Sequence, residues 1–212
     1  MIISITSLKG GVGKSTISQN IAVCFAHMGY KVAIVDTDLN ASSVHWSGMR
    51  GEDMPHITVV GITESEALRK NIKQLHKDYD IIIIDGTPSL SKLVSTIMVL
   101  GDIVLIPIRP GGFDIWATEK FIEKYDQAKA LKEDMQAYFI MNEYSDGINL
   151  NREIREALSQ MEIGVLKSTL KHRVAYTEAV FLGQGVFEYR DLKARIEVTD
   201  LTNEILEILK TV

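Results

Sequence analysis

The chain has 212 residues, of which 46% are apolar and 24% charged, and its formal net charge at pH 7 is −5. This composition is typical of a globular chain with one domain, residues 1–212, and excludes a uniformly basic surface, so any nucleic-acid contact has to come from a local patch. The single Cys24 excludes an internal disulfide, and no run approaches the roughly 20 apolar residues of a membrane-spanning helix. With no basic-plus-apolar leader at the N-terminus, we expect a cytoplasmic protein.

The most informative stretch follows the first predicted strand, Ile2–Thr6, and precedes a helix that ends at Gly29. It consists of Lys9, Gly10, Gly11, Val12, Gly13, Lys14, Ser15 and Thr16. Strand, glycine loop and helix in this order form a phosphate cradle, because backbone N–H groups turn inward and the positive end of the helix faces the anion. We expect Lys14 to reach the β- and γ-phosphates of a nucleotide, and the Ser15 hydroxyl to hold Mg²⁺. A glycine-rich turn without a ligand is the alternative.

Strands and helices alternate along the rest of the chain. The predicted strands are Lys31–Asp36, Ile57–Val60, Asp80–Asp85, Ile103–Ile108, Ala137–Met141 and Gly164–Leu166. The predicted helices are Ala41–Met49, Glu64–Lys77, Leu90–Leu100, Asp114–Leu131, Leu150–Met161, Tyr176–Leu182 and Val198–Lys210. Near-continuous apolar strands that alternate with helices predict an α/β fold, with a mostly parallel sheet covered by helices on both faces. In such a sheet ligands bind at the carboxyl ends of the strands.

Three acidic residues stand where predicted strands end. Asp36 and Asp38 leave the second strand at positions i and i+2, so both point toward the phosphate end of the sheet. Alternatively, both merely cap the next helix. Asp85 ends an isoleucine strand and is followed by Gly86, which predicts a carboxylate that holds Mg²⁺ through water.

The string K-G-G-x-G-K-[ST] resembles the deviant Walker A motif of the ParA/MinD ATPases, and the resemblance covers essentially the whole chain. In that family two subunits sandwich two ATP molecules, and the signature lysine, here Lys9, reaches the partner's nucleotide. The resemblance implies a Mg²⁺-dependent ATPase in which Lys9, Lys14, Asp38 and Asp85 are catalytic. Asp38 would orient the attacking water, and Asp36 and Asp38 would lie near the Mg²⁺. Leu39–Asn40 replaces the usual Pro-Gln, a departure that bears on the local loop geometry.

The resemblance also implies which residues lie near the adenine. The segment 106–114, with Pro110 and Phe113, resembles the loop that flanks the base, and Asp114 can cap the helix that follows. Asn142 corresponds to an asparagine that pairs with the base in several relatives, and an amide offers both a donor and an acceptor to adenine. A simple turn role for Asn142 remains the alternative.

For function, the resemblance implies a partition ATPase of the small plasmid ParA type. The ATP-bound homodimer would hold non-specific double-stranded DNA on the nucleoid, and a ParB-like or other cargo adaptor would release it by stimulating hydrolysis. The candidate DNA contacts lie in two C-terminal basic clusters, which could also be solvated surface. These contacts are Lys167, Lys171, Arg173, Lys193 and Arg195.

Two other functions remain open beside DNA partition. A MinD-like membrane-associated ATPase needs a basic amphipathic C-terminal helix, but the polar face of residues 202–212 is mostly acidic, so we expect no membrane partner. A protein-cargo-positioning ATPase fits the same motifs, and the sequence does not identify the cargo. The sequence shows no second-substrate site that would support a metabolic P-loop enzyme, and one cysteine cannot hold an iron–sulfur cluster.

Overall fold

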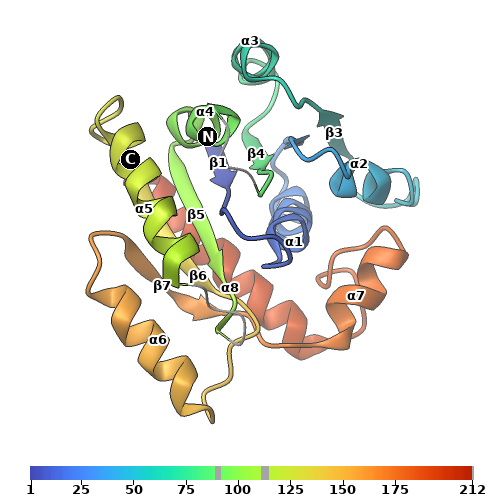
Figure 1. Ribbon diagram of the computed structural model, residues 1–212. Helices are drawn as coiled ribbons and strands as arrows, with labels where there is room; N and C mark the ends of the chain where they lie inside the picture. The colour runs from blue at the N-terminus through green and yellow to red at the C-terminus, as the bar shows by residue number, and fades with distance from the viewer. Residues whose placement is uncertain (89–91, 111–114, 212) are drawn as a thin grey trace.

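The computed structural model describes residues 1–88, 92–110 and 115–211. Seven parallel strands form one sheet in the order β3-β2-β4-β1-β5-β6-β7 (Figure 1). The strands are β1 (Ile2–Ile5), β2 (Val32–Asp36), β3 (Ile57–Gly61), β4 (Ile81–Asp85), β5 (Ile103–Ile108), β6 (Gln136–Met141) and β7 (Gly164–Thr169). The predicted α/β fold with a parallel sheet is therefore confirmed.

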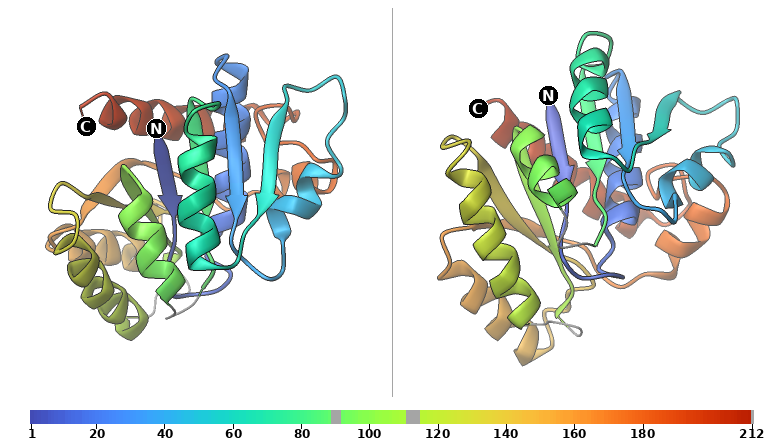
Figure 2. Two further views of the ribbon diagram at one scale, coloured as in Figure 1. Left: turned by 90° about the horizontal axis from the view of Figure 1, so that it is seen from above. Right: turned by 45° about the horizontal axis from the view of Figure 1, so that its top comes forward.

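Helices cover both faces of the sheet, as the two views of Figure 2 show. The helices are α1 (Lys14–His27), α2 (Ser42–Ser47), α3 (Ser65–Leu75), α4 (Lys92–Leu100), α5 (Ile115–Lys129), α6 (Asn149–Ser159), α7 (Val174–Phe181) and α8 (Leu192–Leu209). Buried side chains of α1, α2, α7 and α8 pack in one core cluster, whereas those of α3, α4, α5 and α6 pack in two clusters on the opposite face.

Strand β4 illustrates why the sheet has to be covered on both sides. Ile81 and Ile83 pack into the cluster with α1 and α8, while Ile82 and Ile84 pack against α3 and α4. All four are fully buried. Because side chains alternate between faces along a strand, an uninterrupted isoleucine run needs an apolar layer on each side.

The register of the sheet brings the acidic residues together. Asp36 of β2 lies opposite Asp85 of β4, and Asp85 in turn lies opposite Ile5 of β1. Since all strands are parallel, these positions share the carboxyl edge of the sheet with the loop that follows β1. The strand order thus places both carboxylates beside the glycine loop.

The main differences from the predicted elements are at the C-terminal end. Helix α8 begins at Leu192, six residues before the predicted start, because Asp191 caps it by accepting a hydrogen bond from the Ala194 N–H at 3.0 Å. Helix α7 begins at Val174 and strand β7 continues to Thr169. The predicted helix starts at Leu90 and Asp114, and the capping role of Asp114, lie outside the described residues.

Helix α8 buries its apolar side in the core. Val198, Leu201, Ile205 and Leu209 belong to the cluster that includes α1 and the sheet. Within the described parts of the chain, no helix is long and apolar enough to cross a membrane.

A buried ion pair joins the end of α2 to the loop between α7 and α8. Both nitrogens of the Arg50 fork donate to the Glu188 carboxylate, at 2.9 and 3.1 Å, and both side chains are 7% exposed. The same guanidinium donates to the carbonyls of Pro55 and Gly183 and lies 5.0 Å from the centre of the Trp46 ring. Removal of Arg50 would leave the Glu188 carboxylate buried with only the His27 imidazole and the Gly185 N–H as partners, at 3.0 and 3.1 Å.

We predict that Arg50→Met lowers the free energy of unfolding by about 3 kcal/mol, because the Glu188 carboxylate would stay buried without its cation. Urea unfolding at pH 7 measures this loss. The matched control is the double variant Arg50→Met/Glu188→Gln, which removes both charges and should recover most of the stability. If the double variant is as unstable as the single one, the charge pairing is not the cause.

Candidate functional site

The loop after β1 and the first turn of α1 form the floor of a cleft. Gly11 and Gly13 have positive φ angles of 72° and 94°, a backbone conformation that glycine adopts without strain. Gly13 is the N-cap of α1, so no side chain occupies the N–H groups of the first turn. These N–H groups and the positive end of the helix dipole are a site for phosphate.

Lys14 is held inside this loop. Its ammonium donates to the Lys9 carbonyl at 3.0 Å, and it lies 3.5 Å from the Ser7 hydroxyl. Burial lowers the pKa of the Lys14 ammonium, whereas the nearby carboxylates of Asp85 and Asp38 act in the opposite direction. A bound phosphate would add negative charge beside this buried cation and stabilise it.

Asp85, like Asp36, is almost fully buried, with 1% of its surface exposed. Its Oδ2 accepts a hydrogen bond from the Ser43 hydroxyl at 2.7 Å, while its buried Oδ1 has no hydrogen-bond partner among the described residues. Burial raises the pKa of Asp85 to about 6, which the Ser43 bond, the Ser15 hydroxyl and the Lys14 charge oppose and the nearby Asp36 carboxylate reinforces.

The buried Oδ1 of Asp85, which has no hydrogen-bond partner among the described residues, fits a Mg²⁺ ion. Mg²⁺ binds oxygen ligands and is commonly held by one or two carboxylates together with phosphate oxygens and water. Ser15 and Asp85 could hold such an ion. In the described part of the chain, no group of three His, Cys, Asp or Glu side chains could hold a metal ion on its own. A Mg²⁺ ion here therefore needs ligands from a nucleotide and from water.

Asp36 makes the helix-capping contact that remained the alternative to a role near Mg²⁺. Its Oδ2 accepts hydrogen bonds from the N–H groups of Ser43 and Val44 at 2.8 and 3.2 Å, so the carboxylate caps α2. Its Oδ1 accepts the Asp38 N–H at 3.1 Å. A role of Asp36 near Mg²⁺ stays a prediction.

Asp38 lines the cleft, and Asn40 holds it there. The backbone N–H and the side-chain amide of Asn40 donate to Asp38 Oδ1 at 2.9 and 3.0 Å. The substitution of the usual Pro-Gln by Leu39–Asn40 therefore supplies its own support for the carboxylate. An Asp followed two residues later by Asn is the local sequence signal from which this turn could have been predicted.

Thr37 is a further residue that the sequence analysis missed. Its N–H and hydroxyl both donate to the Asp85 carbonyl, at 3.0 and 2.8 Å, and its hydroxyl oxygen accepts the Thr87 N–H at 3.2 Å. It thus joins the loops that follow β2 and β4. Gly86 packs directly on β1, where an added Cβ would lie 2.6 Å from the Ile5 carbonyl oxygen, so any larger residue would push the two strands apart.

Two of the three residues predicted to lie near the base, Pro110 and Asn142, belong to the described part of the chain. Pro110 is buried after β5, and Phe113 lies outside the described residues. Asn142, at the end of β6, does not point into open space: its amide Nδ2 donates to the Val12 carbonyl of the phosphate loop at 2.9 Å. Its contact with adenine stays a prediction.

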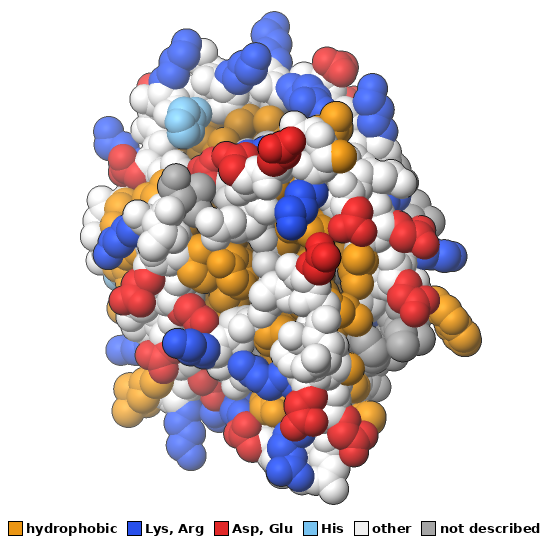
Figure 3. Space-filling view, turned by 90° about the vertical axis from the view of Figure 1, so that its left-hand side faces the viewer, with side chains coloured by type: hydrophobic (Ala, Val, Ile, Leu, Met, Phe, Trp, Pro, Cys, Tyr) orange, Lys and Arg blue, Asp and Glu red, His pale blue; other side chains and the backbone are white. Residues whose placement is uncertain are grey.

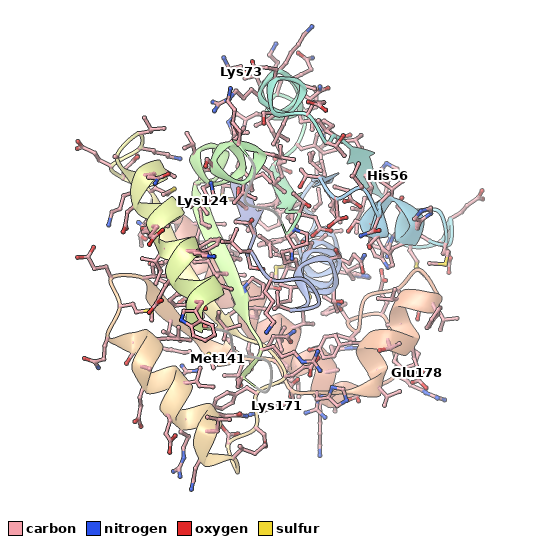
Figure 4. All side chains as sticks on the ribbon, in the orientation of Figure 1. His56, Lys73, Lys124, Met141, Lys171 and Glu178 are labelled. Carbon is pink, nitrogen blue, oxygen red and sulfur yellow. The ribbon has the colours of Figure 1, made fainter. Side chains whose placement is uncertain are left out.

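The cleft has a volume of about 540 Å³ and extends from the phosphate loop to the loop after β7. Lys171 and Arg173, predicted to contact DNA, line this cleft together with Tyr176. Figure 4 shows Lys171 near Met141, the last residue of β6, and the backbone N–H of Leu170 donates to the Met141 carbonyl at 3.0 Å. The structure thus places these two basic residues in the wall of the nucleotide cleft.

Three of the five predicted DNA contacts have partners within the chain. Lys171 pairs with Asp146 at 2.6 Å, and Arg173 binds the Glu197 carboxylate through Nε and Nη2. The Arg195 guanidinium donates to the Tyr189 carbonyl at 3.2 Å. The other two, Lys167 and Lys193, are exposed to solvent.

The glycine loop, the carboxylates at the strand ends and the cleft agree with a known group of proteins. Residues 3–186 match the family described as the CobQ/CobB/MinD/ParA nucleotide binding domain. The chain belongs to this family. The predicted resemblance to ParA/MinD proteins is therefore confirmed, and the family is described as a nucleotide binding domain.

Individual proteins resemble most or nearly all of the chain. The maintenance of carboxysome distribution protein A of Halothiobacillus neapolitanus is 27% identical over 207 residues, which are 96% of this chain and 95% of that protein. Protein ParA of Rhizobium radiobacter is 27% identical over 179 residues, covering 83% and 80%. Cobyrinic acid a,c-diamide synthase from Mycobacterium smegmatis, solved with an ATP analog and magnesium, superposes with a TM-score of 0.82 at 17% identity, covering 99% and 95%. This last likeness shows a shared fold.

We predict that Asp85→Asn stabilises the protein when nucleotide and metal are absent. Folding raises the carboxyl pKa of Asp85 from 3.8 to about 6. Ionisation of Asp85 therefore makes the folded state less stable above pH 6. At pH 7.5 the neutral amide should increase the free energy of unfolding by up to roughly 3 kcal/mol, since one pKa unit corresponds to about 1.4 kcal/mol. The gain should shrink as the pH is lowered toward 5, because the wild-type carboxyl then takes up its proton.

Urea unfolding in the presence of a chelator measures this difference at both pH values. The same variant should bind Mg²⁺-nucleotide more weakly, because the amide lacks the negative charge that attracts the metal ion. An Asp85→Asn protein that is less stable than the wild type at pH 7.5 would contradict the assignment.

Proposed function

We propose that this family member is a ParA-type ATPase that binds ATP and Mg²⁺, dimerises around the nucleotide and positions a cargo along nucleoid DNA. The observation that carries the proposal is a phosphate loop with two lysines, Lys9 and Lys14, beside a cleft that Lys14 lines together with Asp38. The first two residues supply positive charge for the phosphates, and the third supplies a carboxylate for water.

In the proposed reaction each residue has one task. Lys14 and the first-turn N–H groups of α1 would bind the β- and γ-phosphates, and Ser15 and Asp85 would hold Mg²⁺, which would supply positive charge to the phosphate oxygens. Asp38, oriented by Asn40, accepts a hydrogen bond from the attacking water. Lys9 contributes a second cation for the transition state, to the nucleotide of the other subunit.

Exposure and charge narrow the residues that could contact the proposed DNA partner. The α5–α6 side, which faces the viewer in Figure 3, carries acidic and basic side chains side by side and so offers no basis for a single-sign DNA surface. Among the five candidate contacts, Lys167 and Lys193 are exposed, whereas Lys171 and Arg173 pair with carboxylates. We therefore assign the first phosphate contacts to Lys167 and Lys193, with the ATP dimer doubling each of them.

A protein assembly is the second candidate cargo. The observation that favours it is the 27% identity, over nearly the whole chain, to a protein named for carboxysome distribution. In that case an adaptor on the assembly would replace the ParB-like partner, and the nucleotide cycle would be the same. The membrane alternative is less well supported, because the apolar side of α8 packs in the core.

We predict that Lys9→Ala binds ATP but does not form the ATP dimer, because the lost cation acts on the partner's nucleotide. Calorimetric titration measures binding, and light scattering with and without ATP measures the mass. Lys14→Ala is the matched control: it removes the same charge from the same loop but should abolish binding itself. A Lys9→Ala protein that dimerises and hydrolyses ATP like the wild type would refute the proposed role.

A second prediction concerns the DNA surface. Lys167→Ala/Lys193→Ala removes up to four contacts from a dimer, so the slope of log affinity against log salt should fall by as much as roughly 3.6. Binding of ATP-loaded protein to random duplex DNA at several salt concentrations measures the slope.

The matched control for this experiment is Lys70→Ala/Lys73→Ala, which removes the same charge from the exposed face of α3, at the far end of the molecule (Figure 4). An equal fall in the control would show a general charge effect and no DNA site. Binding to anionic liposomes without DNA binding would favour the MinD-like alternative.

A further inference from the structure

Asn142 connects the end of β6 to the phosphate loop. Its backbone N–H continues the sheet by donating to the Ile108 carbonyl at 2.8 Å, and its side-chain amide donates to the Val12 carbonyl at 2.9 Å. The amide lies so close to Gly13 that an added Cβ there would overlap it. Gly13 is thus required by this contact as well as by its positive φ.

The bond to Val12 bears on the phosphate cradle through the geometry of the peptide. The carbonyl and the N–H of one trans peptide point in opposite directions, so a bond that fixes the Val12 carbonyl also fixes the direction of the Gly13 N–H. The Gly13 carbonyl in turn accepts the Ile17 N–H at 2.9 Å and starts α1. Asn142 therefore contacts the loop at the peptide that leads into the helix.

Asn142 is itself held in place by its neighbours. Glu143 has a φ of +53°, unusual for a residue with a side chain, and its carboxylate pairs with Arg109 Nε at 2.7 Å. On the other side, the Met141 carbonyl accepts the Leu170 N–H and the Tyr144 N–H donates to the Leu170 carbonyl. Contacts to two neighbouring loops thus fix the turn that carries the amide.

We propose that Asn142 is a positioning residue for the phosphate loop, which sets the affinity for a polyphosphate chain whatever base is attached. This role differs from reading the adenine, which would act on ATP alone. The proposal rests on nucleotide binding at the proposed ATPase site but is independent of DNA, cargo and hydrolysis.

The test compares three probes: ATP, GTP and inorganic tripolyphosphate, each with Mg²⁺. In Asn142→Ala the affinity for all three should fall by the same factor, about fivefold, the size expected for one lost hydrogen bond. Calorimetry measures each affinity, and the melting temperature without ligand monitors folding. Asn71→Ala is the matched control, because its amide also donates to a backbone carbonyl, that of Ala67, on the exposed face of α3; its affinities should equal those of the wild type.

A loss confined to ATP would overturn the proposal and make Asn142 a base-reading residue. Unchanged affinities for all three probes would overturn it as well. If the alanine variant does not fold, Asn142→Leu, which keeps the size but lacks the donor, replaces it.

Hydrogen exchange provides a readout that needs no ligand. In the nucleotide-free variant, amides of residues 10–16 should exchange faster than in the wild type, while those of β1 and α8 stay unchanged. This measurement tests the role of Asn142 even if the protein turns out not to hydrolyse ATP. Unchanged exchange in residues 10–16 would overturn the proposal.

Discussion

The buried carboxylate of Asp85 is the constraint on which the rest of the site depends. An ionised group without water is unfavourable, so the surrounding residues have to compensate. The Ser43 hydroxyl binds one oxygen, and Lys14 lies near enough to stabilise the negative charge. The remaining oxygen, Oδ1, accepts no bond from the described residues. The protein therefore carries an incomplete charge balance at the carboxyl edge of its sheet, which a metal ion and phosphate can complete.

Helix α2 belongs to this arrangement although it is only six residues long. Its N-terminal N–H groups bind Asp36, its Ser43 hydroxyl binds Asp85, and Gln19 of α1 donates to the same hydroxyl at 3.3 Å. At its other end Arg50 ties it to the loop before α8. The loop that carries Asp38 leads directly into this helix. The Asp38 carboxylate is thus supported, through α2, by contacts to two strands, α1 and the C-terminal part of the chain.

Much of the fold could be predicted, because the relevant signals are local in sequence. The isoleucine run of β4 favours a doubly covered strand, and the glycine loop favours a strand-to-helix phosphate site over a simple turn. The strand order could not be predicted, and it is the order that puts Asp36 beside Asp85. For the same reason the partners of the basic cluster could not be predicted: Lys171 and Arg173 are close in sequence, but Asp146 and Glu197, to which they bind, lie 25 and 24 residues away. The Asn142–Val12 bond spans 130 residues and leaves no local pattern.

The strand order also bears on how the protein is synthesised. Strand β1 has β4 and β5 as its neighbours, so the phosphate loop leaves the ribosome long before the strands that flank it. Pairing between such distant segments is slow, because the entropy of closing a long loop is lost before any stabilising contact forms. A nascent chain that ends before Asp85 carries the complete glycine motif but no folded cradle. Formation of the phosphate cradle therefore has to wait until β4 has inserted between β1 and β2.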